Sequence, residues 1–180
     1  MTLLATERRY TGRIIHLDVD TVGFPDGSRG QLEMIRHPGA AAVVPFVDPL
    51  DHPDPQVLLL RQFRHAANGY LWEVPAGRLD PGETPEGCAR RELREEAGRE
   101  AGSLRKLTAI YTTPGFTDEV IHLFAAQELA ATETAREADE FMEVHALRWS
   151  EVGKLVASGA VQDGKTLVTL MFVQCFLRRA

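Results

Sequence analysis

The stretch GRLDPGETPEGCARRELREEAGR, residues 77–99, decides the fold of this 180-residue chain. Residues 85–97 within it are predicted to form a helix. Thr84 is a good N-cap, Pro85 suits the first helical position, and Gly98 suits the position just past the end. Both ends of the helix are thus predicted from local chemistry.

Three glutamates gather on one face of this predicted helix. Glu92, Glu95 and Glu96 have the spacing i, i+3 and i+4, so they share a face and repel one another by roughly a few tenths of a kcal/mol per pair. Arg91 offsets only part of that repulsion. Mg²⁺ would relieve it, because this ion prefers carboxylate oxygens, water and phosphates as ligands. From the helix alone, the alternative is that the three glutamates form an ordinary solvent-exposed face without a metal.

The spacing upstream of the helix favours the metal site. Five residues separate Gly77 from Glu83, and seven more precede the run RELREEAG, residues 91–98. Together they match the pattern G-x5-E-x7-R-E-U-x-E-E-x-G-U except at its last position, where U is an aliphatic residue. The stretch therefore resembles the signature of the Nudix hydrolases. Arg99 occupies the last position, where we expect altered packing and intact chemistry.

The resemblance implies roles for individual residues. The implied ligands of a divalent cation, which is usually Mg²⁺ and otherwise Mn²⁺ or another divalent ion, are Glu92, Glu96, Glu95, the carbonyl of Ala76, and Glu83. Glu95 and Arg91 are also expected to take part in catalysis, with Arg91 orienting the glutamates. The implied reaction is hydrolysis of a nucleoside diphosphate linked to another group. A metal ion would neutralise the diphosphate and lower the pKa of the attacking water.

A second stretch, YTTPGFTDE at residues 111–119, is similar to the Y-x-S-P-G-F-S-x-E stretch of the ADP-ribose pyrophosphatase subfamily. A plain Pro-Gly turn is the alternative, but Pro114 lies 15 residues beyond Arg99, which is the position typical of the subfamily. Further blocks similar to the subfamily are residues 37–40, 61–64 and 72–77, and the resemblance covers about residues 12–178. His65-Ala66 replaces the usual pair of prolines, which leaves the substrate preference open.

The subfamily resemblance also implies substrate contacts. Arg64 would contact the diphosphate or the terminal ribose, and Asp80 would face that ribose. Pro114 and Gly115 are expected at the substrate as well. Arginine suits the first task because its planar fork holds two phosphate oxygens. A surface ion pair is the alternative for Arg64.

The catalytic base of the subfamily is commonly a glutamate on a mobile loop, and residues 136–144 correspond to that loop. We predict Glu140 as the base, with Glu137 and Asp139 as close competitors. A base on a loop could reach the metal-bound water when the loop closes on substrate. The alternative is an acidic, solvated loop without a catalytic role.

The rest of the chain predicts an α+β fold. Residues 10–36 alternate polar and apolar around a turn at 24–28, which indicates an antiparallel meander. Later strands are expected at 40–47, 57–64, 70–75, 107–111, 120–126 and 141–147, and helices from about 150 and 166. This order favours a mixed β-sheet between helices, and the resemblance implies the α/β/α sandwich of the Nudix fold.

We expect two units, an N-terminal β segment at 1–38 and a Nudix domain at 39–180. The first is too short to bury a core alone, so it should pack on its own body or on a second subunit. The resemblance implies a homodimer with swapped segments, in which each segment covers the partner's adenine. Ile14 and Phe24 are candidates for that contact.

Composition excludes several classes of protein. Lys and Arg number 20 against 26 Asp and Glu, so the net charge of −6 provides no basic face for nucleic acid. Cys88 and Cys175 stand alone and the six histidines are scattered, which argues against disulfides and zinc. Without a signal pattern or a long apolar run, no membrane partner is expected and a cytoplasmic protein is predicted.

One further motif competes with the Nudix signature. Residues 159–166, GAVQDGKT, satisfy the P-loop pattern G-x-x-x-x-G-K-[ST]. A P-loop needs a strand before it and a nucleotide-binding domain after it, but a helix-like segment precedes this stretch and only 14 residues follow Thr166. We therefore interpret it as a connection between helices, with Thr166 capping the last one.

The sequence as a whole predicts a Mg²⁺-dependent enzyme that hydrolyses ADP-ribose, or a related ADP-sugar, to AMP and ribose 5-phosphate. Another nucleoside diphosphate derivative remains an alternative, namely GDP-mannose, FAD, NADH or a diadenosine polyphosphate. A third possibility is a non-catalytic Nudix module that binds a nucleotide to regulate a partner. The four box glutamates and Arg91 favour the enzyme.

Overall fold

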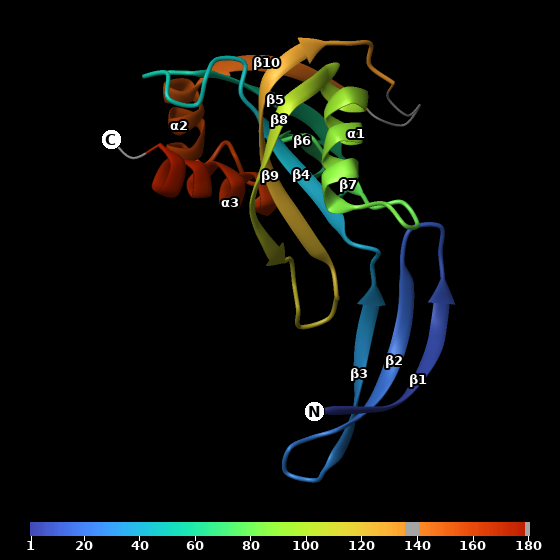
Figure 1. Ribbon diagram of the computed structural model, residues 1–180. Helices are drawn as coiled ribbons and strands as arrows, with labels where there is room; N and C mark the ends of the chain where they lie inside the picture. The colour runs from blue at the N-terminus through green and yellow to red at the C-terminus, as the bar shows by residue number, and fades with distance from the viewer. Residues whose placement is uncertain (136–140, 179–180) are drawn as a thin grey trace.

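The computed structural model describes residues 1–135 and 141–178. A body of two β-sheets carries helix α1 (Pro85–Ala97) on one side and helices α2 (Trp149–Ala157) and α3 (Gly164–Phe172) on the other. A three-stranded arm extends from this body (Figure 1). No described helix is long and apolar enough to cross a membrane.

The body has a mixed sheet and an antiparallel sheet. The mixed sheet has the order β7 (Ala76–Arg78), β4 (Ala40–Pro45), β9 (Val120–Ala131), β8 (Arg99–Tyr111), with β4 and β9 parallel. The antiparallel sheet has the order β10 (Met142–Arg148), β5 (Gln56–Arg64), β6 (Gly69–Glu73). A 3₁₀ turn, His65–Ala67, links β5 to β6, and a π-helical turn, Val173–Leu177, follows α3.

Strand β4 is buried along its whole length and separates two apolar cores. Ala42 and Val44 face the core that α2 and α3 cover. Val43 faces the core that α1 covers, where Leu93 is fully buried. Successive side chains of a strand point to opposite faces, so one central strand serves both layers. The predicted α/β/α sandwich with a mixed sheet is confirmed.

Helix α1 begins and ends where the sequence predicts. The Thr84 hydroxyl accepts a hydrogen bond from the Gly87 amide at 3.1 Å, and Gly98 adopts a left-handed conformation with φ 61°. The apolar strip of the helix, which includes Leu93, docks on the mixed sheet. This docking turns Glu92 and Glu96 toward β7, where both are buried.

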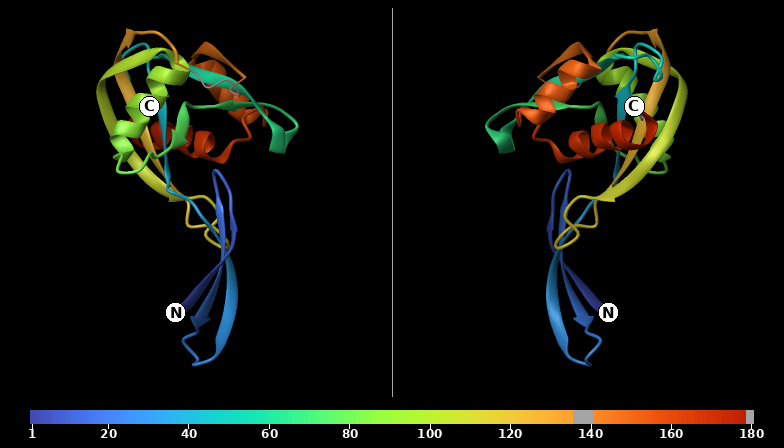
Figure 2. Two further views of the ribbon diagram at one scale, coloured as in Figure 1. Left: turned by 90° about the vertical axis from the view of Figure 1, so that its right-hand side faces the viewer. Right: turned by 90° about the vertical axis from the view of Figure 1, so that its left-hand side faces the viewer.

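The arm contains β1 (Thr2–Thr11), β2 (His16–Gly23) and β3 (Arg29–Arg36), paired antiparallel in that order. The predicted meander is confirmed, although it begins at Thr2 rather than near residue 10. Strand β3 contacts the body at the loop between β8 and β9, where the Ile35 amide donates to the Phe116 carbonyl at 2.7 Å. Figure 2 shows the arm standing away from the body. Every residue of β1 is exposed.

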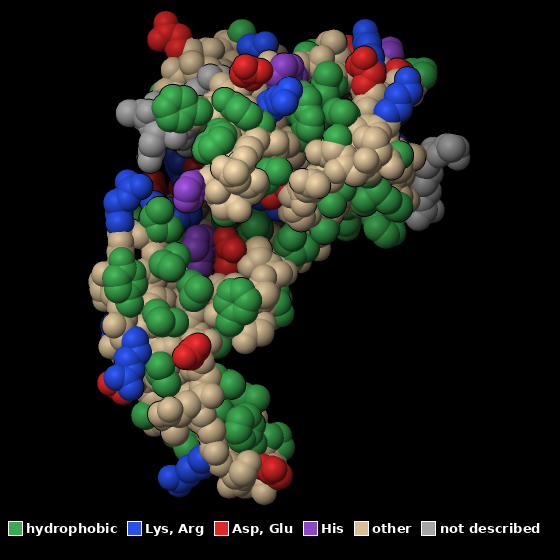
Figure 3. Space-filling model, turned by 180° about the vertical axis from the view of Figure 1, so that it is seen from behind, with side chains coloured by type: hydrophobic (Ala, Val, Ile, Leu, Met, Phe, Trp, Pro, Cys, Tyr) green, Lys and Arg blue, Asp and Glu red, His purple; other side chains and the backbone are tan. Residues whose placement is uncertain are grey.

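Apolar side chains are spread over the surface of the arm (Figure 3). The large exposed ones are Met1, Leu3, Leu4, Tyr10, Ile14 and Ile15. Single exposed apolar residues are ordinary, but this many on one small sheet leave it without a core of its own. The arm is thus a thin sheet held by strand pairing and by its junction with the body.

Several local predictions differ from the structure, since β4 ends at Pro45 rather than 47 and β9 at Ala131 rather than 126. Strand β8 begins at Arg99 instead of 107, because its first half also pairs with β9. Asp163, rather than Thr166, caps α3, since its side chain accepts from the Thr166 amide at 2.9 Å. The Thr166 hydroxyl instead accepts from the Val74 amide. Because α2 precedes the GAVQDGKT stretch, its assignment as a connection between helices is correct.

Candidate active site

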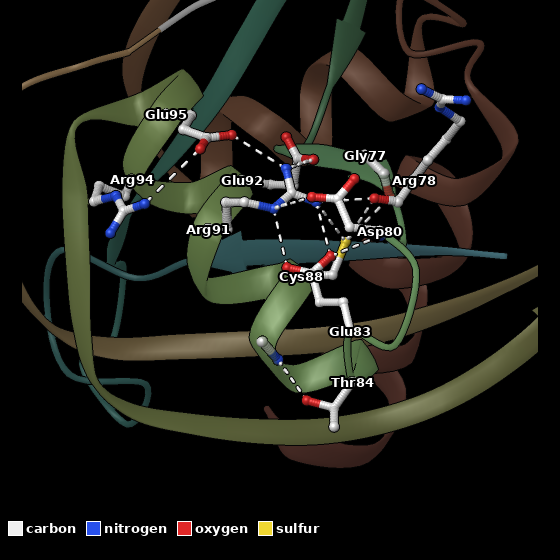
Figure 4. A network of polar contacts seen from close by, with 11 residues as sticks. Gly77, Arg78, Asp80, Glu83, Thr84, Cys88, Arg91, Glu92, Arg94 and Glu95 are labelled. Atoms are coloured by element: carbon white, nitrogen blue, oxygen red, sulfur yellow. Dashed lines mark hydrogen bonds and ion pairs between the residues drawn. The ribbon is translucent and has the colours of Figure 1, made fainter. Parts of the chain in front are cut away.

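Arg91 lies at the centre of the network of carboxylates in Figure 4. Its Nε and Nη2 donate to the two oxygens of Glu83 at 3.0 and 2.9 Å. Its Nη1 donates to Glu92 Oε1 at 2.6 Å and to Glu95 Oε2 at 3.1 Å. Nη2 also donates to the Arg78 carbonyl at 2.9 Å. The structure thus gives Arg91 the contacts expected of a residue that orients the glutamates.

These contacts favour the charged forms of Arg91 and Glu83. The hydrogen bonds to Glu83 are the main reason that the pKa of Arg91 is raised. In return, the hydrogen bonds from Arg91 lower the pKa of Glu83. Burial raises the pKa of the neighbouring Cys88 thiol to about 12, so this cysteine stays protonated and unreactive near neutral pH.

Glu92 and Glu96 lie against the loop and strand that precede the helix. The Ala76 amide donates to Glu96 Oε2 at 2.9 Å. A Cβ atom on Gly77 would lie 1.8 Å from Glu92 Oε1, so only glycine leaves room for this carboxylate. The side chains of both glutamates are almost fully buried. The buried Glu92 carboxylate therefore requires a glycine at position 77.

The donor set fits a hard divalent cation in its chemistry. Carboxylate oxygens of α1 gather beside β7, where the Ala76 amide donates to Glu96, and Mg²⁺ prefers oxygen ligands. Within residues 1–135 and 141–178, no three His, Cys, Asp or Glu side chains form a ready-made metal cage. Arg91, and Arg94 at 3.8 Å from Glu95, supply the positive charge among the glutamates, and the four carboxylates of Glu83, Glu92, Glu95 and Glu96 outnumber these two guanidinium groups.

A cavity of about 850 Å³ is lined by Ala76 and Gly77, which lie against Glu96 and Glu92, but none of the four signature glutamates lines it. Of the residues predicted at the site, Arg64 and Ala76 line it. Asp80 does not line the cavity. Its side chain is 71% exposed, and its Oδ2 lies 3.8 Å from Arg91 Nε. Of the two adenine candidates, Ile14 lines the cavity, whereas Phe24 packs against Gly30 in the arm.

Pro114 and Gly115 are both exposed, in the loop between β8 and β9. They do not line the cavity, but Tyr111 and Glu119 at the two ends of this loop do. The structure therefore brings the loop to the cavity without placing its Pro-Gly turn there.

The predicted base, Glu140, and its competitors Glu137 and Asp139 lie outside the described residues. The described residue Ala135 lies close to the signature helix, because its amide donates to the Glu95 carbonyl at 3.1 Å.

One wall of the cavity carries a polar cluster that the sequence did not reveal. Arg64 donates from Nε and Nη2 to the two oxygens of Glu73, both at 2.7 Å, and Lys165 also binds Glu73. Burial raises the pKa of Glu73, but the hydrogen bonds and charges of Arg64 and Lys165 outweigh it and leave this pKa below its ordinary value. The signals in the sequence were the resemblance of the blocks at 61–64 and 72–77, and these blocks do not include Lys165.

A helix with glutamates arranged around an arginine, beside a cavity with cationic side chains, defines a hydrolase site of the Nudix type. A family model described as NUDIX domain matches residues 36–170. The chain therefore belongs to the Nudix family. Members of this family generally use divalent cations.

Known proteins refine this assignment. ADP-ribose pyrophosphatase of Bacillus subtilis (strain 168) is 40% identical over 173 residues, covering 95% of this chain and 91% of that protein. Methanol dehydrogenase activator of Bacillus methanolicus is 34% identical with the same coverage. GDP-mannose pyrophosphatase of Yersinia enterocolitica is 38% identical over 133 residues, covering 69% of each chain. The chain is thus a Nudix hydrolase of the ADP-ribose pyrophosphatase-like kind.

A solved structure supports the fold independently. The crystal structure of an ADP compounds hydrolase superposes with a TM-score of 0.79 and 24% sequence identity, covering 98% of this chain and 93% of that one. Because nearly the whole chain is covered, the likeness extends to the arm as well as to the body.

Proposed function

We propose that this enzyme hydrolyses the diphosphate bond of ADP-ribose, or of a related ADP-sugar, to AMP and ribose 5-phosphate. The observation that carries this proposal is the position of the buried pair Glu92 and Glu96 beside a cavity lined by Arg64. A cation on that face would reverse the local sign of charge, so that an acidic protein can bind an acidic substrate.

Residues of the signature would hold the cation, which we propose to be Mg²⁺, Mn²⁺ or another divalent ion. The proposed ligands are Glu92, Glu96, Glu95, the carbonyl of Ala76, and Glu83. When bound, such an ion neutralises the diphosphate and lowers the pKa of water. Arg91 orients Glu83, Glu92 and Glu95 through its hydrogen bonds.

Substrate contacts and proton transfer are assigned to other residues. Arg64 would hold phosphate oxygens, because its guanidinium faces the cavity and is oriented by Glu73. Asp80 remains a proposed contact of the terminal ribose, and Pro114 and Gly115 remain proposed substrate contacts. Glu140 remains the proposed base, and the position of Ala135 beside Glu95 supports a base arriving from this segment.

The arm, as part of an N-terminal unit at 1–38, is proposed to pair with a second copy of the chain, while 39–180 forms the Nudix domain. The exposed apolar residues of β1 support this, since they lack a core to enter. Ile14 remains the proposed adenine contact, and within one chain it lines the cavity of that same chain. Analytical ultracentrifugation tests the dimer, and a monomer at micromolar concentration would contradict it.

GDP-mannose is the second candidate substrate. The named activity of the Yersinia enterocolitica relative favours it, although that protein shares a smaller part of this chain than the ADP-ribose pyrophosphatase does. A panel of ADP-ribose, GDP-mannose, FAD, NADH and diadenosine polyphosphates, compared by kcat/KM, ranks these candidates. The highest kcat/KM for ADP-ribose would support the proposal. A higher kcat/KM for another compound would make that compound the preferred substrate instead.

The proposed reaction is tested by product analysis. Protein, ADP-ribose and Mg²⁺ are incubated together, and the products are separated by ion-exchange chromatography. We expect AMP and ribose 5-phosphate in equal amounts. An AMP yield no higher than that of an EDTA control would overturn the proposal and favour a nucleotide-binding module instead.

A further inference from the structure

Asp118 lies between the arm and the cavity, and it belongs neither to the Nudix signature nor to the cavity lining. It is part of the loop between β8 and β9, where its neighbour Glu119 lines the cavity. The link from β3 to β4 runs beside this loop and contains His37, which lines the cavity as well. Asp118 is therefore placed where one side chain can hold two segments of the cavity wall together.

A short parallel pairing joins the loop to the end of β3. It is built around one bridge, between Ile35 and Thr117. The Ile35 amide donates to the Phe116 carbonyl at 2.7 Å, and the Asp118 amide donates to the Ile35 carbonyl at 3.3 Å. In a parallel pair, the next hydrogen bond would run from the His37 amide to the Asp118 carbonyl. The Asp118 side chain takes that amide instead, at 2.8 Å from its Oδ1, and thereby ends the pairing.

Beyond Asp118, the chain pairs with the other end of its own loop. The Glu119 carbonyl accepts from the Thr112 amide at 3.2 Å, and Glu119 Oε2 accepts from the Thr112 hydroxyl at 2.9 Å. Glu119 Oε1 lies 3.5 Å from His37 Nδ1. The Glu119 carboxylate is thus held between Thr112 and His37, which both line the cavity.

The second oxygen of Asp118 faces the arm. Its Oδ2 lies 3.4 Å from Arg36 Nη1. The same guanidinium also binds Asp18 and Asp20, two buried carboxylates of β2, so Arg36 is fixed from the arm side. An exposed ion pair at this distance contributes little free energy. It does keep Oδ2 turned toward the arm, which leaves Oδ1 for the His37 amide.

We propose that Asp118 is a positioning residue for substrate binding, and that it acts through Glu119. Its carboxylate fixes the end of the loop against the link from β3 to β4, so the Glu119 carboxylate stays at the cavity. A carboxylate accepts hydrogen bonds from hydroxyl groups, and a nucleoside diphosphate sugar offers several of them. This inference rests on the proposed function, because the substrate is the one proposed there.

The test compares two replacements of Asp118. Asp118→Ala removes both contacts of the carboxylate, whereas the amide oxygen of Asp118→Asn can still accept from the His37 amide. The two groups freed in Asp118→Ala lie at exposed positions, so water can replace the lost contacts and the fold should persist. Asp51→Ala, which changes an exposed aspartate away from the cavity, is the control. The measurements are KM and kcat for ADP-ribose at saturating Mg²⁺, with thermal melting to report folding.

For Asp118→Ala we expect KM to rise about 5- to 10-fold with kcat within about twofold of wild type, because substrate binding is weakened and the signature glutamates are untouched. Asp118→Asn and Asp51→Ala should keep KM within about twofold of wild type. A purely structural role would lower the melting temperature without this split between KM and kcat. A wild-type KM in folded Asp118→Ala, or the same rise of KM in Asp118→Asn, would overturn the inference.

A double-variant cycle tests whether Asp118 acts through Glu119. In the background of Glu119→Ala, adding Asp118→Ala should change KM by less than about twofold, since the side chain that it positions is already gone. The full effect of Asp118→Ala in this background would overturn the inference. Asp118→Ser takes the place of the alanine variant if the latter does not fold, with the same expectations.

The wild-type protein separates this inference from the proposed function. If it neither binds nor hydrolyses ADP-ribose, the proposed function fails and the inference falls with it. If wild type is active and folded Asp118→Ala matches it in KM, only the inference fails.

Discussion

Replacing Gly77 with alanine tests whether the position of one carboxylate governs activity. The new Cβ would lie 1.8 Å from Glu92 Oε1 and 2.2 Å from its Cδ. Cβ atoms essentially never come within 3.0 Å of another atom, so the carboxylate must move by about 1 Å or more. The atoms in the way belong to the end of a side chain, so we expect the fold to persist while Glu92 is displaced.

The expected loss of activity follows from the intolerance of metal sites to displacement. Mg²⁺ demands near-ideal octahedral geometry, and a misplacement of about 1 Å at a catalytic site can cost about 100-fold in rate. For Gly77→Ala we therefore expect kcat/KM for ADP-ribose to fall about 100-fold, or about 2.7 kcal/mol of transition-state stabilisation. The apparent affinity for Mg²⁺ should fall as well.

The assay is the initial rate of AMP formation at several concentrations of ADP-ribose and of Mg²⁺. Gly153→Ala provides the matched control, because an added Cβ at this position in α2 meets nothing within 4 Å. That control should keep full activity and gain about 0.5–1 kcal/mol in unfolding free energy. Wild-type kcat/KM in folded Gly77→Ala, with an unchanged requirement for Mg²⁺, would refute the reasoning.

Three further perturbations test the account. Thr84→Ala removes the side-chain cap of α1 and should lower the free energy of unfolding by about 1 kcal/mol, measured with urea; no change would mean that the cap is dispensable. Arg91→Met leaves the signature carboxylates without their shared cation, so the free energy of unfolding in EDTA should fall by about 2 kcal/mol. Added Mg²⁺ should then raise the melting temperature of this variant more than that of wild type, and an equal rise would contradict this. The pKa of Glu73 is lowered in the folded state, so its stabilising effect is present above the unfolded glutamate pKa of about 4.3 and is lost as the pH falls through the folded value. Glu73→Gln should therefore lose less stability than wild type as the pH falls below about 4.3. An equal dependence of the unfolding free energy on pH in the two proteins, measured with urea, would argue against the ion pair.

The most local features were the most predictable from the sequence. Helix α1 was predicted to the residue because Thr84, Pro85 and Gly98 act on the backbone next to them. The strands at 40–45 and 56–64 were found because they are continuous apolar runs. In each case, the signal and the structure it creates lie in the same few residues.

Features made by distant contacts were less predictable. The first half of β8 is a strand because it pairs with β9, and its own alternation is too weak to show this. The capping of α3 by Asp163 was missed because Thr166 looks like an equally good cap in sequence. Only the fold shows that the Thr166 hydroxyl is occupied by the Val74 amide, far away in the chain.

The candidate site divides in the same way. The spacing of the signature predicts the gathering of Glu83, Glu92 and Glu95 around Arg91, because all four lie within a short loop and helix. The cluster of Arg64, Glu73 and Lys165 joins β5, β6 and α3, and no sequence spacing encodes such a meeting. Some of the acidic residues that make the chain's net charge negative thus form the proposed cation site, and a negative net charge does not exclude a phosphate ligand.

The most direct test of the central claim compares product formation by wild type and Glu96→Gln with ADP-ribose and saturating Mg²⁺. Glu86→Gln, which changes an exposed glutamate of the same helix, is the control. Wild type and Glu86→Gln should release AMP and ribose 5-phosphate at equal rates, whereas folded Glu96→Gln should release no more than an EDTA blank. AMP release by Glu96→Gln at the wild-type rate would contradict the account.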